Sequence, residues 1–242
     1  EGLDAHLSEI SYQLDLQTLP EQGNRMVAMR AGSRDGAWMF TAEGEGDDAL
    51  EQARFDAVLE AKLPSHAKIE AEGIDVEGKG RVIAPVEVIV VGGREVVVIG
   101  KMHFDGVDVV QPAQAIYGLN GTMELNQSLV LPEEGSKPRW SYIETVNPFK
   151  RVDTHKVQPY LHVRQSLSFD RAEADGRAVG PFFGEVTWTQ NLLSFANVDL
   201  ELFGGVFVGE SFVNLHGDHL QVGMLGRLSE FDTSLLNPGR EA

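Results

Sequence analysis

The stretch Val86 to Phe104 reads VEVIVVGGREVVVIGKMHF and is the longest strongly apolar run in the chain. Gly92-Gly93 at its middle can adopt the positive φ angles of a two-residue β-hairpin turn, and β-branched residues flank the pair on both sides. Such a turn places Val88 opposite Val97, and both faces of the hairpin are then apolar. One face holds Val86, Val88, Val90, Val97 and Ile99. We therefore expect other strands to cover the hairpin on two sides, as in a barrel or a thick sandwich.

The rest of the chain predicts further strands between polar turns. Residues 6–19 alternate apolar and polar side chains, Asn120-Gly121 is a strong hairpin signal, and Gly204-Gly205 turns the first hairpin of a meander over 197–228. Only 48–63 suggests a helix, as a short helical turn followed by a strand. The prediction is an all-β protein of about a dozen antiparallel strands, barrel-like or a strongly coiled β-sandwich, with at most one or two short helices.

Length and composition are compatible with one domain. A chain of 242 residues can bury a large core without metal or disulfide support, and it contains no cysteine. We predict a single β-rich domain over 1–242. The polar, Gly- and Pro-bearing segment 132–139 is the one candidate for an internal module boundary, although a long surface loop explains it better.

The charge limits the classes of partner. A formal net charge of −17 repels phosphate backbones, so nucleic acid is not an expected partner. Charged residues interrupt every long apolar run, so no transmembrane helix is expected. The first residue is Glu1 rather than Met, which suggests processing or trimming. The oligomeric state and the compartment are left open.

A candidate metal site lies at a predicted tight turn. His216 and His219 flank Gly217-Asp218, and a two-residue turn would bring both imidazoles together with the Asp218 carboxylate. No fourth ligand is evident in the sequence. An exposed turn with solvated histidines is therefore the favoured interpretation. No cofactor is expected.

Three carboxylates form a second candidate site. In the predicted hairpin around Gly204-Gly205, the side chains of Asp199, Glu201 and Glu210 share one face, with Asp199 directly opposite Glu210. The opposite face of the same hairpin is predicted to hold Val198, Leu200, Leu202 and Phe207. They can be read as calcium ligands or as the acid and base of a glycosidase. The favoured alternative is the solvated face of a very acidic protein.

The segment from Trp140 to Trp188 combines aromatic and titratable side chains most densely. Strand alternation places Tyr142 with Glu144 and His162 with Arg164, and these four are the catalytic candidates for binding and polarising a carbonyl group. The candidates for binding the ligand itself are Trp140, Tyr160, Trp188 and His103. The competing interpretation is an ordinary polar surface, and for His103 a structural role at a strand end.

Glu87 interrupts an apolar row, with Val98 predicted opposite it. We expect it either near an open rim or buried with a raised pKa.

These patterns favour a binding protein. The main hypothesis is a small apolar molecule held in an enclosed β-barrel cavity, because the chain has more apolar strand faces than one core layer uses. It includes an enzymatic version, a cofactor-independent cyclase, isomerase or hydratase. The alternative is a carbohydrate-binding or carbohydrate-cleaving β-sandwich that uses the acidic face.

Overall fold

The computed structural model describes residues 10–18, 24–33, 36–47, 49, 51–63, 67–69, 74–111, 114–131, 139–141, 166–174, 176–215 and 221–232. In these residues the chain forms strands and turns and contains no helix, which confirms the all-β class. The strands are β1 (Ile10–Thr18), β2 (Asn24–Ser33), β3 (Trp38–Asp47), β4 (Gln52–Lys62), β5 (Ala67–Ile69), β6 (Ile74–Val91), β7 (Glu95–Gln111), β8 (Gln114–Val130), β9 (Arg139–Trp140), β10 (Ser166–Phe169), β11 (Arg171–Ala174), β12 (Arg177–Val179), β13 (Phe182–Thr189), β14 (Leu192–Leu202), β15 (Gly205–Asn214) and β16 (Gln221–Ser229).

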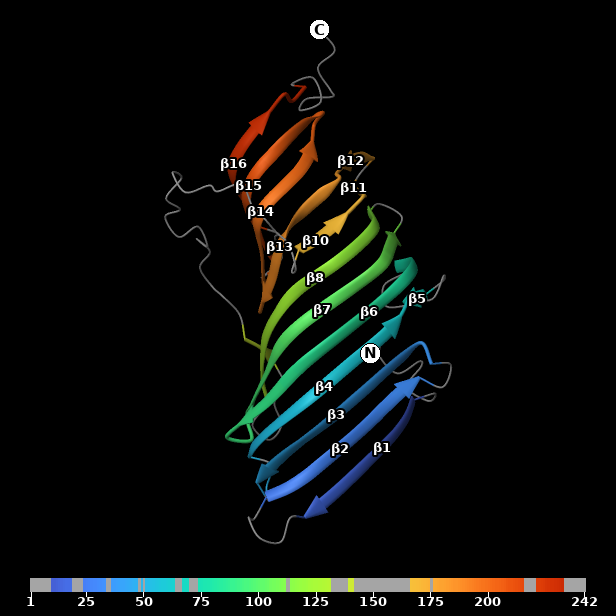
Figure 1. Ribbon diagram of the computed structural model, residues 1–242, viewed down its shortest axis with the longest axis vertical. Helices are drawn as coiled ribbons and strands as arrows, with labels where there is room; N and C mark the ends of the chain where they lie inside the picture. The colour runs from blue at the N-terminus through green and yellow to red at the C-terminus, as the bar shows by residue number, and fades with distance from the viewer. Residues whose placement is uncertain are drawn as a thin grey trace.

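The described strands form one long sheet (Figure 1). Its order is β1-β2-β3-β4-β6-β7-β8-β10-β13-β14-β15-β16, with the short strands β5, β9, β11 and β12 attached at its margins. Neighbours pair antiparallel, as expected, except that β13 continues past β10 to pair with β8 in parallel. In the described part of the chain, β1 and β16 lie at opposite ends and do not pair with each other, so this sheet is open.

The predicted hairpin lies at the centre of the sheet, but its register differs by one residue. Gly92 and Gly93 both have φ of 62°, and the carbonyl of Val91 accepts the Arg94 N–H at 3.2 Å, as a two-residue turn requires. Arg94 is an additional residue between the turn and the second strand, because Val91 pairs with Glu95 and not with Arg94. The Arg94 carbonyl instead accepts a hydrogen bond from the Leu131 N–H at 2.6 Å.

This slip exchanges the two faces of the second strand. Val88 lies opposite Val98 rather than Val97, so Val96 and Val98 share a face with Val86, Val88 and Val90. The predicted grouping of Val97 and Ile99 with that face is wrong, because a shift of one residue turns every side chain of a strand to the other side.

Two other predicted turns are wrong in position. Asn120-Gly121 lies inside the continuous strand β8, where Gly121 has φ of 104° and Asn120 Oδ1 accepts the Gly106 N–H at 2.8 Å, so the pair stabilises a bulge and not a hairpin. The β14–β15 turn uses Phe203-Gly204, with φ of 55° and 73°. A Cβ on Gly205 would clash with the backbone of Phe231, so Gly205 permits a close approach and does not turn the chain.

The segment 48–63 is extended in its described residues. Residues Gln52–Lys62 form β4, whose backbone is hydrogen-bonded to β3 on one side and to β6 on the other. The strand half of the prediction is confirmed and no helical turn is described. Tertiary pairing prevails here because the strand completes two hydrogen-bonded ladders at once.

The predicted module boundary 132–139 lies outside the described residues except for Arg139. The sheet continues across it, because β8 pairs with β9, β10, β11 and β13, all of which follow the boundary in sequence. The single-domain prediction stays a prediction.

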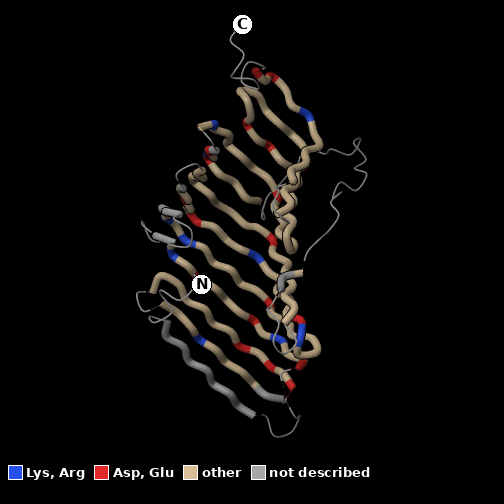
Figure 2. Tube along the Cα trace, turned by 180° about the vertical axis from the view of Figure 1, so that it is seen from behind, with Lys and Arg blue, Asp and Glu red and all other residues tan. Residues whose placement is uncertain are grey.

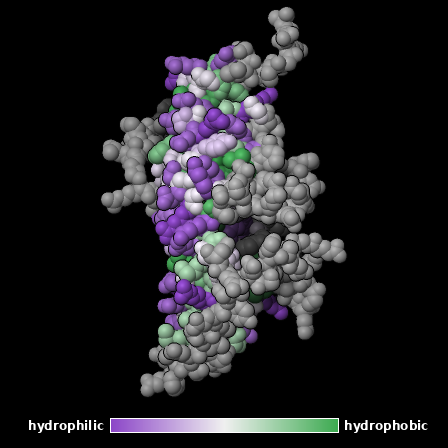
Figure 3. All heavy atoms as spheres, turned by 90° about the vertical axis from the view of Figure 1, so that its right-hand side faces the viewer, coloured by the Kyte–Doolittle hydropathy of each residue, from purple (hydrophilic) through white to green (hydrophobic). Residues whose placement is uncertain are grey.

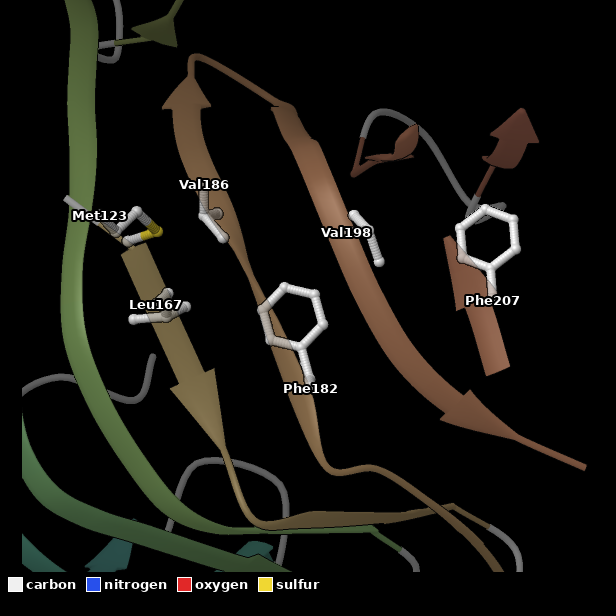
Figure 4. Close-up of a cluster of buried hydrophobic side chains, with 6 residues drawn as sticks. All are labelled: Met123, Leu167, Phe182, Val186, Val198 and Phe207. Atoms are coloured by element: carbon white, nitrogen blue, oxygen red, sulfur yellow. The ribbon is translucent and has the colours of Figure 1, made fainter. Parts of the chain in front are cut away.

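The best-packed part of the sheet lies around β8, β10, β13, β14 and β15. Six buried side chains cluster there on one side of the sheet: Met123, Leu167, Phe182, Val186, Val198 and Phe207 (Figure 4). Phe182 stacks on Phe169 with ring centroids 4.9 Å apart and meets Phe195 edge-on at 6.0 Å. The predicted grouping of Val198, Leu200, Leu202 and Phe207 on one face is confirmed.

Glycines let neighbouring strands approach closely where the sheet coils. At Gly44 a Cβ would meet the backbone of Arg54 and lie 2.7 Å from the Phe55 ring, and at Gly226 it would lie 2.7 Å from the Phe207 ring. In both cases an aromatic ring covers the glycine on the adjacent strand, an arrangement that compensates for the missing side chain.

The contact between Gly44 and Phe55 gives a stability prediction. Gly44→Ala forces a methyl group against backbone that cannot move aside, and we expect it to lower the free energy of unfolding by about 2 kcal/mol. Gly78→Ala is the control, since its Cβ would lie 3.3 Å from the Leu63 side chain and 3.4 Å from the Asp108 carbonyl oxygen, much farther than the backbone contact at Gly44. Urea denaturation measures both, and equal effects of the two changes would contradict this account.

Candidate functional site

Most of the predicted site residues lie outside the described residues. They are Tyr142, Glu144, Tyr160, His162 and Arg164 of the proposed catalytic and binding set, and His216, Asp218 and His219 of the proposed metal turn. Their roles stay predictions.

Trp188 is described on β13, and its role in binding a ligand stays a prediction. It shares a face with Val186 and packs half-buried against the core cluster. Its indole N–H donates to the Gln190 carbonyl at 2.7 Å. The register places Trp140 opposite Leu129 on β8, and Leu129 belongs to the same face.

His103 lies on the opposite side of the sheet from Trp188. It shares a face with Val97, Ile99 and Lys101, and its Nδ1 lies 2.9 Å from Thr122 Oγ1 across the β7–β8 ladder. An imidazole so placed is paired with a neutral hydroxyl on a hydrated surface.

Glu87 is opposite Ile99 and not Val98, because of the register slip in the central hairpin. Its carboxylate forms an ion pair with Arg54 on β4. It is therefore a partly exposed member of a cross-strand pair.

The three carboxylates share a face, but their predicted opposition is wrong. Since the turn is at Phe203-Gly204, Asp199 lies opposite Val208, and a bulge in β14 leaves Glu210 without a direct partner on that strand. In the described residues no group of three His, Asp or Glu side chains is arranged to hold a metal ion. The carbohydrate hypothesis stays a prediction.

The largest chemically uniform feature is one face of the whole sheet, which we call the apolar face and define as the side that carries Val86, Val88 and Val90. On β4 its members are Ala53, Phe55, Ala57, Leu59 and Ala61. On β3 they are Trp38, Phe40, Ala42, Gly44 and Gly46. From β3 to β16, outside the bulged ends of β6, β7 and β8 and the short strands that pair with those ends, the register of the described residues places no Asp, Glu, Lys or Arg on this face. On β2 the register places Arg25 there, opposite Gly46.

The apolar face is continuous from strand to strand. One row of register partners runs from Met29 on β2 through Ala42, Ala57, Val86 and Gly100 to Leu125 on β8, and the same row continues through Trp188. With adjacent strands roughly 4.8 Å apart, a row of this kind is tens of ångströms long. Sequence reasoning found the apolar strand faces but not their union, which depends on the register of every ladder.

The apolar face combines buried and accessible positions. Ala42 and Ala57 are buried, whereas Leu59 is 38% exposed and Met29 is 41% exposed. The strands in extensive contact are almost all neighbours within the sheet, so among the described residues no second layer of strands packs across this face.

The other side of the sheet, which we call the polar face, carries the charges. Glu43, Glu45, Asp56 and Glu60 lie there on β3 and β4, and Arg81 pairs with Glu60 at 2.8 Å. Charged residues are spread along the strands and hairpin ends (Figure 2). The side of the molecule in Figure 3 is mostly hydrophilic where residues are described, with smaller hydrophobic patches.

One carboxylate at the bulged end of the central strands has a shifted pKa. Burial of Asp108 tends to raise its pKa, but the hydrogen bond from Lys79 at 2.6 Å, the Gly118 N–H at 2.7 Å and the Lys79 charge together lower the pKa below its ordinary value of 3.8. Asp108 thereby ties β6, β7 and β8 together where Gly118 has φ of 68°.

Comparisons with protein-family models, with curated proteins and with solved structures found no match. The part of the chain that the structure describes also contains no helix long and apolar enough to cross a membrane. Any functional assignment therefore depends on the geometry of the chain itself.

The pKa of Asp108 predicts a pH dependence. Because the folded pKa is lowered, the ionised carboxylate stabilises the fold above pH 3.8, and this contribution is lost as the pH falls through the lower folded pKa. Asp108→Asn should reduce the free energy of unfolding near neutral pH. The difference from the unaltered protein should shrink in acid, as measured by denaturation at a series of pH values. A difference that does not change with pH would contradict the assignment.

Proposed function

We propose that this protein binds a neutral, elongated apolar molecule along the apolar face of its sheet. The observation that carries the proposal is the continuity of that face, on which the register of the described residues places no charged residue from β3 to β16 outside the bulged ends and the short strands paired with them. The side chains of this face that reach solvent, such as Met29 and Leu59, are in unfavourable contact with water, and a bound apolar molecule would remove that contact.

Burial of the exposed side chains supplies the binding free energy. Each Å² of apolar surface removed from water contributes about 25 cal/mol, and both the ligand and the side chains around Met29 and Leu59 lose such contact on binding. Positioning groups are few, since the apolar face carries only isolated polar residues such as Gln127, whose amide donates to the Trp188 and Gln190 carbonyls at 3.3 Å. The shape of the ligand's apolar part therefore determines binding to this face more than its polar groups do.

Electrostatics argues against an anionic ligand, and the described apolar face from β2 to β4 offers no carboxylate to pair with a cationic one. The formal charge of −17 and the carboxylates on the polar face create a negative potential around the sheet. An anionic amphiphile is repelled by this potential, whereas an uncharged hydrocarbon is not. The ligand class that fits best is a neutral molecule with a long hydrocarbon part.

This proposal keeps the ligand class of the sequence hypothesis and changes the site. An open face replaces the enclosed cavity, since the described strands form an open sheet. Conversion of the ligand by Tyr142, Glu144, His162 and Arg164 stays a prediction, and it would add catalysis to the same binding function.

Neighbouring residues on β4 provide a matched test. Leu59 on the apolar face is 38% exposed and Val58 on the polar face is 40% exposed. We expect Leu59→Lys to weaken binding of the neutral dye Nile red tenfold or more, since it places an ammonium group against hydrocarbon, and Val58→Lys to leave the affinity unchanged. Fluorescence titration gives both affinities, and a saturated long-chain alcohol should displace the dye.

A second pair repeats the comparison on β2, where Met29 lies on the apolar face and Met26 on the polar face. Equal effects of Met29→Lys and Met26→Lys would place the dye elsewhere. If the dye binds only after the apolar face is freed by dissociation of a dimer, the occupant of the face is a second copy and the proposal fails.

A further inference from the structure

In the described part of the chain, the end strand β16 pairs with a neighbour along one edge only. Residues Gln221–Ser229 pair with β15 on one side, and in the described part of the chain no strand lies on the other. Open edges in proteins are commonly blocked by proline, lysine or several charged residues. Within β16 the sequence QVGMLGRLS has no proline and no lysine, and Arg227 is its single charged residue.

Large apolar side chains are exposed along this edge. Val222 is 62% exposed, the highest value among the exposed large hydrophobic residues described, and Met224 and Leu225 are each 46% exposed. Val222 and Met224 lie on the apolar face, whereas Leu225 lies on the polar face opposite Glu210. A strand added at the edge would shield apolar side chains on both faces and hydrogen-bond the backbone groups that face away from β15 at the same time.

We propose that a second copy of this chain pairs with that edge, β16 against β16, antiparallel about a two-fold axis at Leu225. Leu225 is the middle residue of the nine in β16, so this register pairs the whole strand with its copy. Val222 then lies opposite Leu228, Met224 opposite Gly226 and Arg227 opposite Gly223. Apolar side chains meet apolar partners or glycine, and the two Arg227 side chains are kept apart.

The symmetry distinguishes this pairing from a head-to-tail edge contact. Pairing β16 with β1 of a second copy joins two different edges and repeats into open chains of molecules, whereas β16 with β16 uses the same edge of both copies and closes as a dimer. The two-fold axis is perpendicular to the sheet, so the apolar faces of both copies lie on the same side. The inference depends on the edge alone and stands whether or not the apolar face binds a ligand.

Sedimentation velocity of the full chain over a range of concentrations tests the proposal. The unaltered protein should show a monomer–dimer equilibrium. Val222→Lys should raise the dissociation constant at least tenfold, because the two-fold axis places one lysine from each copy in the interface. Val58→Lys is the control, since this valine is 40% exposed in the interior of the sheet. A protein that stays monomeric, larger open-ended species, or equal effects of both substitutions would each overturn the proposal.

Cross-linking tests the register. The chain has no cysteine, so Leu225→Cys introduces a single thiol, and directly opposed strand residues have Cα atoms about 4.5–5.5 Å apart, within the range of a disulfide. Mild oxidation should convert this variant into a covalent dimer, while Val58→Cys stays monomeric. Efficient cross-linking of both variants, or of neither, would contradict the proposed axis.

Discussion

Backbone hydrogen bonding in register across twelve successive strands is the constraint on which this structure depends. In a pleated strand the side chains alternate between the two faces of the sheet, and directly opposed residues on neighbouring strands point to the same face. The register of each ladder therefore determines which residues of the next strand lie on each face. A slip of one residue at any ladder would mix carboxylates with the hydrocarbon of the apolar face. The separation of charge from hydrocarbon over the sheet is therefore a property of the ladders together and not of any one strand.

Irregularities in the ladders preserve this separation while the sheet coils. Arg94 adds a residue after the central turn, and bulges in β6, β7 and β8 bring Gly80, Gly106 and Gly118 into positive φ. Asn120 and Asp108 fix the bulged backbone by accepting its free N–H groups. Phe55 and Phe207 cover glycines on adjacent strands. Each irregularity satisfies backbone groups that a sharply coiled sheet would otherwise expose.

The apolar face and the β16 edge follow from the same architecture. A sheet closed on itself has no edges, and a sheet covered by a second layer has no accessible hydrocarbon face. The described strands neither close into a barrel nor pack against a second layer of strands. Apolar side chains and the outer backbone groups of the end strands are therefore accessible for association. A ligand on the apolar face and a second copy at the edge relieve different parts of this exposure.

The sequence by itself determined the all-β class, the hairpin turn at Gly92-Gly93, and the grouping of Val198, Leu200, Leu202 and Phe207, because turn chemistry and the alternation within a strand are local properties. It misplaced the turns at Asn120-Gly121 and Gly204-Gly205, since glycine permits positive φ in a bulge and close approach of backbone as readily as in a hairpin. Only the tertiary structure decided which strand faces join. The candidate site in the described residues is formed by register partners far apart in sequence, such as Ala42, Val86 and Leu125. Their alignment depends on the register of every ladder between them.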